Sequence, residues 1–181
     1  MCQVEAITHV AHTLTQIETL SLYNHANVSL LTVFPPNLLR LSMNNPKLDH
    51  HVWGKCRFPL SLQELDLEIN AFHQRHPIDL VFQPLTVLTR LQKLAIRKVL
   101  LVEPKTCFPD LQLWPHLNSL CLRVATVKLV HQVLAAVPTT QLHKLHIEIE
   151  EDDPRRLGMF EGLEDADWGN LKTLEMDFVD F

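Results

Sequence analysis

The sequence has little glycine, with four among 181 residues, and its four cysteines lie far apart. So few glycines mean that the turns must rely on proline, asparagine and aspartate. Cys2, Cys56, Cys107 and Cys121 form no Cys-x-x-Cys pair. Their spacing provides neither a zinc knuckle nor a dense disulfide framework, and it suits a reducing compartment.

Excess basic charge and long apolar runs are also lacking. Sixteen Lys and Arg residues stand against 21 Asp and Glu residues, which gives a net charge of −5. This balance argues against nucleic acid and anionic lipid as partners. Apolar stretches such as Val99–Val102 are far shorter than the ~20 residues of a membrane-spanning helix. The first residues lack the basic and apolar segments of a secretory signal. We therefore expect a cytoplasmic or nuclear protein with no membrane segment.

Motifs for cofactor binding and catalysis are absent as well. The sequence contains no P-loop, no G-x-G-x-x-G, no G-x-S-x-G and no H-E-x-x-H. The acidic run Glu148–Asp153 lacks the alternating ligands and central glycine of an EF-hand. Paired histidines provide no complete ligand set at local spacing; they are His9 and His12, His50 and His51 ahead of Cys56, and His73 and His76. We expect no cofactor, no metal and no catalytic residue.

What the sequence does contain is seven copies of one pattern, apolar-x-x-apolar-x-apolar. The copies begin at Ile17, Leu38, Leu62, Leu91, Leu117, Leu142 and Leu171. We call the middle apolar residue of each copy its marker; the markers are Leu20, Leu41, Leu65, Leu94, Leu120, Leu145 and Leu174. They are separated by 21 to 29 residues. A repeat of this length and consensus is the signature of a leucine-rich-repeat solenoid.

The pattern predicts an α/β solenoid whose strands form a parallel sheet on the concave face. We expect strands near 18–23, 39–44, 63–68, 92–97, 118–123, 143–149 and 172–178, within a single domain over residues 1–181. Helical spacing of apolar residues predicts return segments that are helical over 4–14 and over 127–137, with Pro138 ending the second. The proline-containing returns are expected to be extended or short turns.

Two further features bear on the stacking of the repeats. An asparagine three residues after the last strand position is common in such repeats, and only the third copy has one, Asn70. We therefore expect irregular curvature. Trp53, Trp114 and Trp168 fall in return segments, where wedging between coils is the usual role and anchoring a partner is the alternative.

The chain resembles the F-box/LRR-like proteins of fungi. The resemblance is carried by the strand and acidic run of residues 139–154, by the Asp-Trp pair at Asp167-Trp168 within 160–168, and by the closing copy of the pattern. It implies a non-enzymatic module that recognises substrates for an F-box-like adaptor. An F-box would precede the repeats, and residues 1–16, which come before the first copy, are too few to form one. We therefore expect a repeat-only member of this group or a fragment.

Alignment of the copies places polar side chains in rows on the concave face. The residues that we expect to contact a partner protein are Tyr23, Arg40, Glu64, Asp66, Glu68, Lys93, Arg97, Arg123, His146 and Glu148. Opposite charges fall on neighbouring strands, at Arg40–Glu64–Lys93, Glu68–Arg97 and Arg123–Glu148. Simple cross-strand pairing is one interpretation, and a recognition surface is the other. The adjacent Arg97 and Arg123 are the best candidates for holding an acidic group.

Two other classes of function remain open. A structural or self-assembly role would use the C-terminal strand, which runs to Phe181, as an edge that pairs between chains. An enzyme would use Cys121, His146 and Glu175, which the alignment places side by side on three strands as a nucleophile, its base and an orienting group.

Overall fold

The computed structural model describes residues 14–23, 34–44, 56–68, 76–77, 82–97, 101–102, 113–123, 127–150 and 166–179. Over these ranges the chain is α/β. The strands are β1 (Thr19–Leu22), β2 (Arg40–Asn44), β3 (Glu64–Glu68), β4 (His76–Pro77), β5 (Lys93–Arg97), β6 (Leu101–Val102), β7 (Ser119–Arg123), β8 (Lys144–Glu150) and β9 (Thr173–Val179). The helices are α4 (Val127–Ala136) and the 3-10 helices η2 (Gln83–Leu85) and η3 (Thr139–Gln141).

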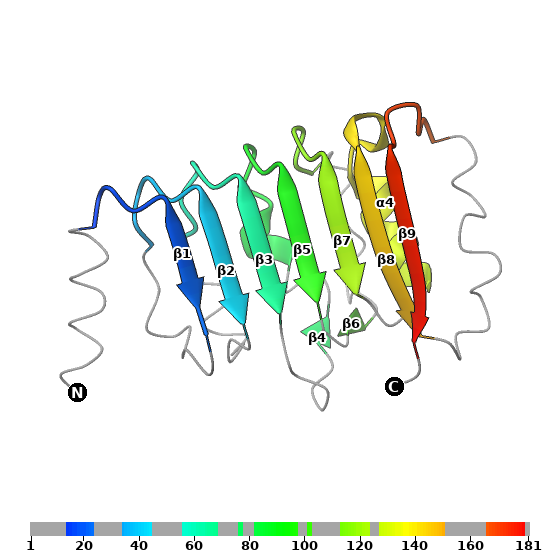
Figure 1. Ribbon diagram of the computed structural model, residues 1–181, viewed down its shortest axis with the longest axis horizontal. Coiled ribbons are helices and arrows are strands. Elements are labelled where there is room, and N and C mark those ends of the chain that lie inside the picture. Colours follow the sequence, from blue (N-terminus) through cyan, green and yellow to red (C-terminus); the bar gives the residue numbers. More distant parts are fainter. Residues whose placement is uncertain are drawn as a thin grey trace.

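Seven strands form one open, all-parallel sheet in the order β1-β2-β3-β5-β7-β8-β9 (Figure 1). The register aligns each marker with the next, as in the pairing of Leu41 with Leu65 and of Leu65 with Leu94. Copies of the pattern are therefore stacked in sequence order, and the predicted parallel sheet is present. The short strands β4 and β6 pair separately, also in parallel.

The core is built from side chains on one face of this sheet. In β3, Leu65 and Leu67 are buried while Glu64, Asp66 and Glu68 are only half-buried on the opposite face. Strands β2, β5 and β7 bury the same two positions. Full burial of a leucine side chain is worth ~1.5–3 kcal/mol. A single strand has nothing to bury these leucines against, so the stack of copies supplies the core.

One β-turn precedes every strand of the large sheet. In each turn, the N–H of the first apolar residue of the pattern donates to the carbonyl three residues earlier. The donor–acceptor pairs are Ile17–Leu14, Leu38–Pro35, Leu62–Pro59, Leu91–Leu88, Leu117–Trp114, Leu142–Thr139 and Leu171–Trp168. Gly169 is the one glycine in these seven turns, and none of them contains the expected aspartate.

Main-chain hydrogen bonds also join each turn to the next copy. The carbonyl of Glu18 accepts from the N–H groups of Leu39 and Arg40 at 2.8 and 2.9 Å. Residues two before the next five markers accept a pair of N–H groups in the same way; these acceptors are Leu39, Gln63, Gln92, Asn118 and His143. The start of each strand is thereby fixed to its neighbour before the sheet ladder begins.

Polar side chains reinforce this junction at three of the turns. The amide of Asn37 donates to the carbonyl of Thr15 at 2.8 Å, and the amide of Asn170 donates to that of Thr140 at 2.6 Å. Ser61 donates to main-chain carbonyls of the preceding copy at 2.9 and 3.0 Å. These ties lie ahead of the strands, whereas the asparagine that we singled out after a strand, Asn70, lies outside the described residues.

Helix α4 lies behind β8 and β9 in Figure 1. Its side chains Val130, Val133 and Leu134 are buried in the core, as the apolar spacing predicts. The predicted helix ahead of the sixth copy is therefore confirmed, with its end at Ala136, two residues before Pro138. The helix expected over 4–14 lies almost entirely outside the described residues.

Trp114 occupies the expected position between copies. Its side chain is buried, its indole N–H donates to the carbonyl of Leu85 at 2.8 Å, and its ring lies 5.5 Å from that of Phe82. Trp168 is half-buried and packs against the same core. Trp53 lies outside the described residues.

The two outer strands of the sheet bury less than the inner ones. On β1, the inward Leu20 and Leu22 are only half-buried. On β9, Leu174 is 47% exposed, although its register partner Leu145 is fully buried. The inward rows therefore lose burial at both edges of the sheet.

Candidate functional site

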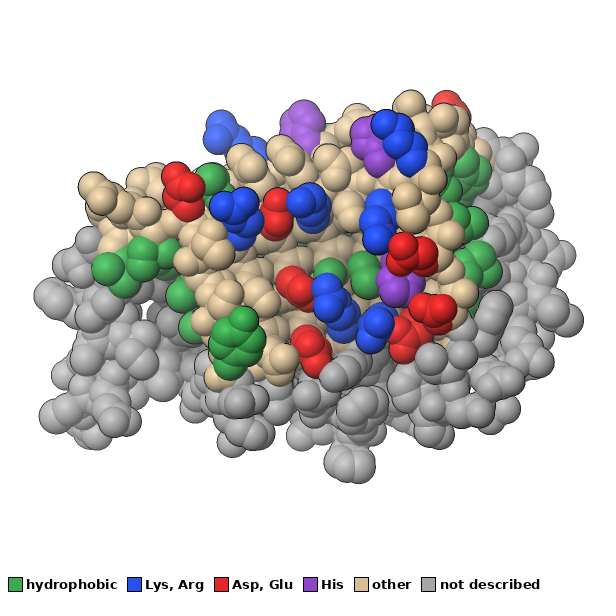
Figure 2. Space-filling view, in the orientation of Figure 1, with side chains coloured by type: hydrophobic (Ala, Val, Ile, Leu, Met, Phe, Trp, Pro, Cys, Tyr) green, Lys and Arg blue, Asp and Glu red, His purple; other side chains and the backbone are tan. Residues whose placement is uncertain are grey.

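The side chains of the large sheet that point away from the core form what we call the open face. They are Thr19 and Ser21 on β1 and Tyr23 directly after it, with the aligned residues of the six other strands. Figure 2 views the molecule from this side and shows charged side chains gathered over its central and right-hand strands. A groove of about 700 Å³ crosses this face from Thr19 on β1 to His146 on β8. Nine of the ten residues predicted to contact a partner lie on strands of the open face, and the tenth, Tyr23, directly follows β1.

Ion pairs between neighbouring strands cover much of the open face. Lys93 lies 2.9 Å from Glu64, and Arg123 lies 2.6 Å from Glu148. Lys144 on β8 lies 3.1 Å from Glu175 on β9. Glu148 is only 13% exposed, but the exposed pairs Lys93–Glu64 and Lys144–Glu175 contribute ~0–1 kcal/mol each. Their main effect is therefore to neutralise the face locally and to fix where its side chains lie.

Arg97 does not pair with the carboxylate that the sequence indicated. Its register partner is Glu68, yet its guanidinium lies 2.9 Å from Asp66, two residues back along β3. Glu68 accepts instead from the amide of Asn44 at 3.2 Å. The reason is that Arg97 is long enough to cross the groove diagonally, so register alone does not decide its partner.

Buried polar atoms without hydrogen-bond partners lie at the floor of the groove. Within the described part of the chain they include Oδ1 of Asp66 and the Nε atoms of Arg97 and Arg123. Arg123 Nε is close enough to Glu148 for an ion pair, but its N–H is not aligned for a hydrogen bond. Such unsatisfied groups cost ~1–3 kcal/mol each.

Asp66 is in the least favourable position of the three. Burial raises the pKa of its carboxyl, the nearby Arg97 opposes this shift, and the neighbouring Glu68 adds to it. Burial therefore outweighs the attraction of its ion-pair partner. The folded chain holds this carboxylate at an electrostatic cost.

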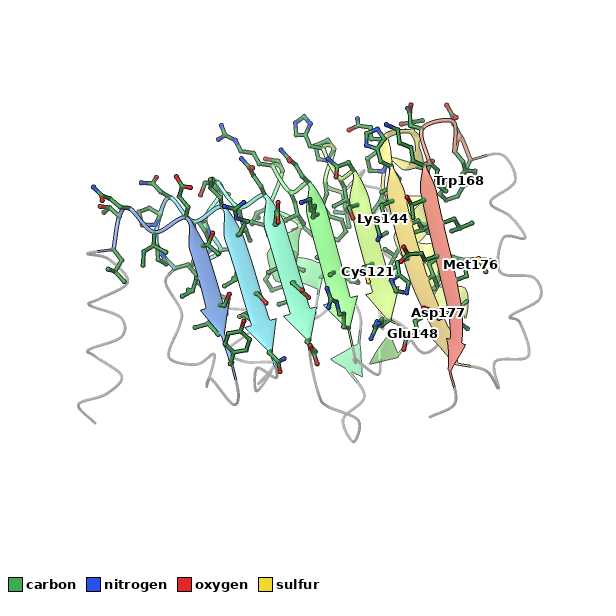
Figure 3. All side chains as sticks on the ribbon, in the orientation of Figure 1. Cys121, Lys144, Glu148, Trp168, Met176 and Asp177 are labelled. Carbon is green, nitrogen blue, oxygen red and sulfur yellow. The ribbon has the colours of Figure 1, made fainter. Side chains whose placement is uncertain are left out.

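The predicted row of Cys121, His146 and Glu175 is present in the register. However, the imidazole of His146 directs both nitrogens toward β9: Nδ1 lies 3.4 Å from Glu175 and Nε2 lies 2.9 Å from Asp177. Figure 3 labels Cys121 on β7 and Asp177 on β9, on opposite sides of β8. Burial raises the pKa of the Cys121 thiol, and Arg97 and Arg123 offset only part of that rise. Among the described residues, the imidazole of His146 is therefore directed at β9 carboxylates, and the surroundings of Cys121 favour the thiol over the thiolate.

Arg40 differs from the other cations of the open face. The sequence placed it beside Glu64, and these two residues are register partners. The carboxylate of Glu64 pairs with Lys93 instead, and Nε of Arg40 donates to the hydroxyl of Thr19 at 3.1 Å. Among the described residues, no carboxylate lies within ion-pair distance of Arg40.

Tyr23 is the most exposed large apolar side chain of those described, at 68%. It lies at the end of β1, on the same side of the sheet as Arg40. The alignment of the copies had already placed it at one end of the predicted surface.

A second hollow of about 420 Å³ lies where the strands of the large sheet begin. Its lining is rich in amides and imidazoles, from Gln92, His116, Asn118, Thr140, Gln141, His143 and Asn170. We did not predict this site. Its residues come from the repeated turns and from the positions two before the markers, so an alignment extended upstream of the pattern would have placed them in one row.

The metal hypotheses find no support in the described ranges, where no three His, Cys, Asp or Glu side chains are grouped for an ion. His9, His12, His50, His51 and His73 lie outside those ranges. Neither of the described cysteines, Cys56 and Cys121, forms a disulfide.

Comparison of the chain with models of protein families, with curated protein sequences and with solved structures found no match. In the described part of the chain, no helix has both the length and the apolar character needed to cross a bilayer.

Proposed function

We propose that this chain is a leucine-rich-repeat solenoid that binds another protein through the open face of its sheet. The observation that carries the proposal is the groove across that face. It crosses six strands, and most of its lining side chains are polar or charged, although the core leucines Leu41, Leu65 and Leu94 also reach it.

The dimensions of the groove favour an extended protein segment as the occupant. Neighbouring strands lie ~4.8 Å apart, so the five intervals from β1 to β8 span ~24 Å. An extended chain covers ~3.4 Å per residue, so a segment of about seven residues fits this length. Among the described residues, the unsatisfied polar atoms of the groove are one acceptor, Oδ1 of Asp66, and two donors, the Nε atoms of Arg97 and Arg123. This favours a segment that offers both donors and acceptors, as a peptide main chain does.

Such a module suits substrate recognition in an F-box-like adaptor, the role that the resemblance to fungal F-box/LRR-like proteins implies. In this proposal the chain performs no chemistry. It selects a partner by the order of charges along the groove, which is acidic on β3 and basic on the next two strands, β5 and β7.

The test is to block the groove without removing a charged residue. Ala95 is the smallest side chain in the middle of the groove, between Asp66 and Cys121 in the register. Ala95→Trp adds bulk there and leaves every charged residue of the groove in the sequence. Val87→Trp is the matched control, because Val87 is 52% exposed and does not line the groove.

Proteins captured from a native extract by the tagged chain would be identified by mass spectrometry, and the leading partner purified. We expect Ala95→Trp to lose binding of that partner while Val87→Trp retains it, with unchanged circular dichroism for both. A partner that binds Ala95→Trp as tightly as the unmodified chain would disprove the proposal.

Self-assembly through β9 is a second candidate, favoured by the exposure of Leu174 at this edge of the sheet. It predicts a molecular mass that rises with concentration in sedimentation equilibrium and that Leu174→Lys returns to 20.9 kDa. A mass of one chain at all concentrations would reject it.

A further inference from the structure

The β1–β2 end of the groove contains a positive charge that the described residues do not neutralise. Arg40 uses Nε to donate to Thr19, and its guanidinium has no other hydrogen-bond partner in the described part of the chain. Its side chain is exposed. The two terminal amino groups of this guanidinium are therefore directed at solvent and can receive a ligand.

Hydroxyl groups lie on the same two strands as this charge. Thr19 is the register partner of Arg40, and Ser21 is the register partner of Ser42, two residues further along the strands. All four residues line the groove. A hydroxyl rotates to donate its proton to whichever acceptor is present, so this end offers several adaptable donors beside one fixed cation.

The remaining cations of the groove are already occupied. Lys93, Arg97, Arg123 and Lys144 each lie within 3.1 Å of a carboxylate on a neighbouring strand. An incoming anion at those positions must displace an internal partner, whereas at Arg40 it displaces only water. Arg97 and Arg123, which the sequence favoured for an acidic group, are therefore poorer sites than Arg40.

We propose that Arg40, with the hydroxyls of Thr19, Ser21 and Ser42, forms a subsite for a phosphate or carboxylate group on a side chain of the bound protein segment. This inference rests on the proposed function and adds the chemistry and position of one contact. Guanidinium groups pair with phosphate and carboxylate through two parallel hydrogen bonds. Tyr23, exposed directly after β1, lies four residues along the strand from Thr19 and offers an aromatic surface further along the same two strands.

The subsite also changes which residues we expect to contribute most of the binding free energy. Tyr and Arg are enriched among the few interface residues that dominate affinity. At the β1–β2 end both types are available, whereas the arginines of β5 and β7 are paired within the fold. We therefore expect the β1–β2 end to contribute most of the binding free energy. The charged centre of the groove then provides charge complementarity to the partner.

The experiment follows the arginine Nε–Hε signals of the ¹⁵N-labelled full chain by NMR. Sodium phosphate and sodium acetate are titrated separately at constant pH and constant ionic strength, with sodium chloride as the balancing salt. We expect saturable shifts of Arg40 Nε–Hε and of the Ser21 and Ser42 amides, and little change at Arg97 and Arg123. Tighter binding of phosphate would indicate a phosphorylated side chain as the ligand, and equal or tighter binding of acetate would indicate an Asp or Glu side chain.

Two variants make this result specific. Arg40→Gln keeps hydrogen-bond donors but removes the charge, and it should weaken phosphate binding by about ten-fold or more. Arg90→Gln is the control, because Arg90 is exposed on the turn before β5 and does not line the groove. Dispersed spectra of both variants verify their folding.

Shifts at Arg40 no larger than those at Arg90, or equal binding by Arg40→Gln, would overturn the subsite. That outcome is separate from failure of the proposed function, which the Ala95→Trp experiment measures with the protein partner. Loss of that partner by Ala95→Trp together with no anion effect at Arg40 would leave the groove as the binding site and remove only this contact.

Discussion

The indole N–H of Trp114 donates to the carbonyl of Leu85 across the core, at 2.8 Å. This bond ties the turn before β7 to the segment that precedes β5. Both groups are buried, so neither can exchange its partner for water.

Trp114→Phe should destabilise the fold by ~1–3 kcal/mol, because the smaller ring leaves a cavity and the carbonyl of Leu85 keeps only one of its two donors, the N–H of Leu88. The measurement is urea denaturation followed by far-ultraviolet circular dichroism. Tyr23→Phe removes a polar atom from an exposed aromatic ring and should change the free energy of unfolding by less than ~0.5 kcal/mol. Equal stability of Trp114→Phe and the unmodified chain would mean that this bond contributes nothing.

The register pair Leu145 and Leu174 should respond unequally to truncation. Leu145 is fully buried, and Leu145→Ala should cost ~2–5 kcal/mol of unfolding free energy. Leu174 is 47% exposed at the edge, and Leu174→Ala should cost less than half as much. Similar losses for the two variants would show that β9 is covered in solution, which would favour the self-assembly candidate.

Cys56 should be unreactive while the chain is folded. Burial raises its pKa to about 11, so the nucleophilic thiolate is scarce at neutral pH. We expect reaction with a disulfide reagent at pH 8 to be slow in buffer and to become fast in denaturing urea. Comparison with a Cys56→Ser variant shows which part of the labelling comes from Cys56. Fast labelling of Cys56 in buffer would contradict its buried position.

Asp66 should make the stability depend on pH in an unusual direction for a carboxylate. Its pKa is raised on folding, so the folded chain binds the proton more tightly than the unfolded chain. The contribution of this group to stability is therefore largest at low pH and is lost as the pH rises through the folded pKa. Comparison with Asp66→Asn by urea denaturation from pH 7 to pH 4 isolates this effect.

The unmodified chain should gain stability relative to Asp66→Asn as the pH falls over that range. A difference that moves the other way would mean that attraction to Arg97 outweighs burial. Arg97→Gln, which removes the cation and keeps the carboxylate, should enlarge the effect.

The strands and their register could be predicted from the sequence because one physical rule fixes both. Inward leucines at Leu65, Leu94 and Leu120 must lie over one another to be buried, and this sets every other residue of the strand. The turns were missed because the pattern was taken to begin at its first apolar residue. The hydrogen bond from Leu117 to Trp114 and its equivalents extend the repeating unit three residues further upstream.

The composition of the open face could be predicted, but its pairing could not. Register gave Arg40 and Glu64 as neighbours, and Glu68 and Arg97 likewise. Which carboxylate a long side chain selects depends on rotamers and on competition, as when Lys93 takes Glu64. The free charge of Arg40 is the result of that competition, so no property of Arg40 alone could indicate it.

The main-chain hydrogen bonds between copies have a consequence for how the number of copies can change in evolution. Each of these carbonyls, such as that of Gln92, accepts from N–H groups of the next copy, and this main-chain bonding does not depend on which side chain the residue carries. Duplication or deletion of one whole unit would thus leave every other junction intact. The array could gain or lose reach in steps of ~4.8 Å, one strand at a time, and so match partners of different length without a new fold.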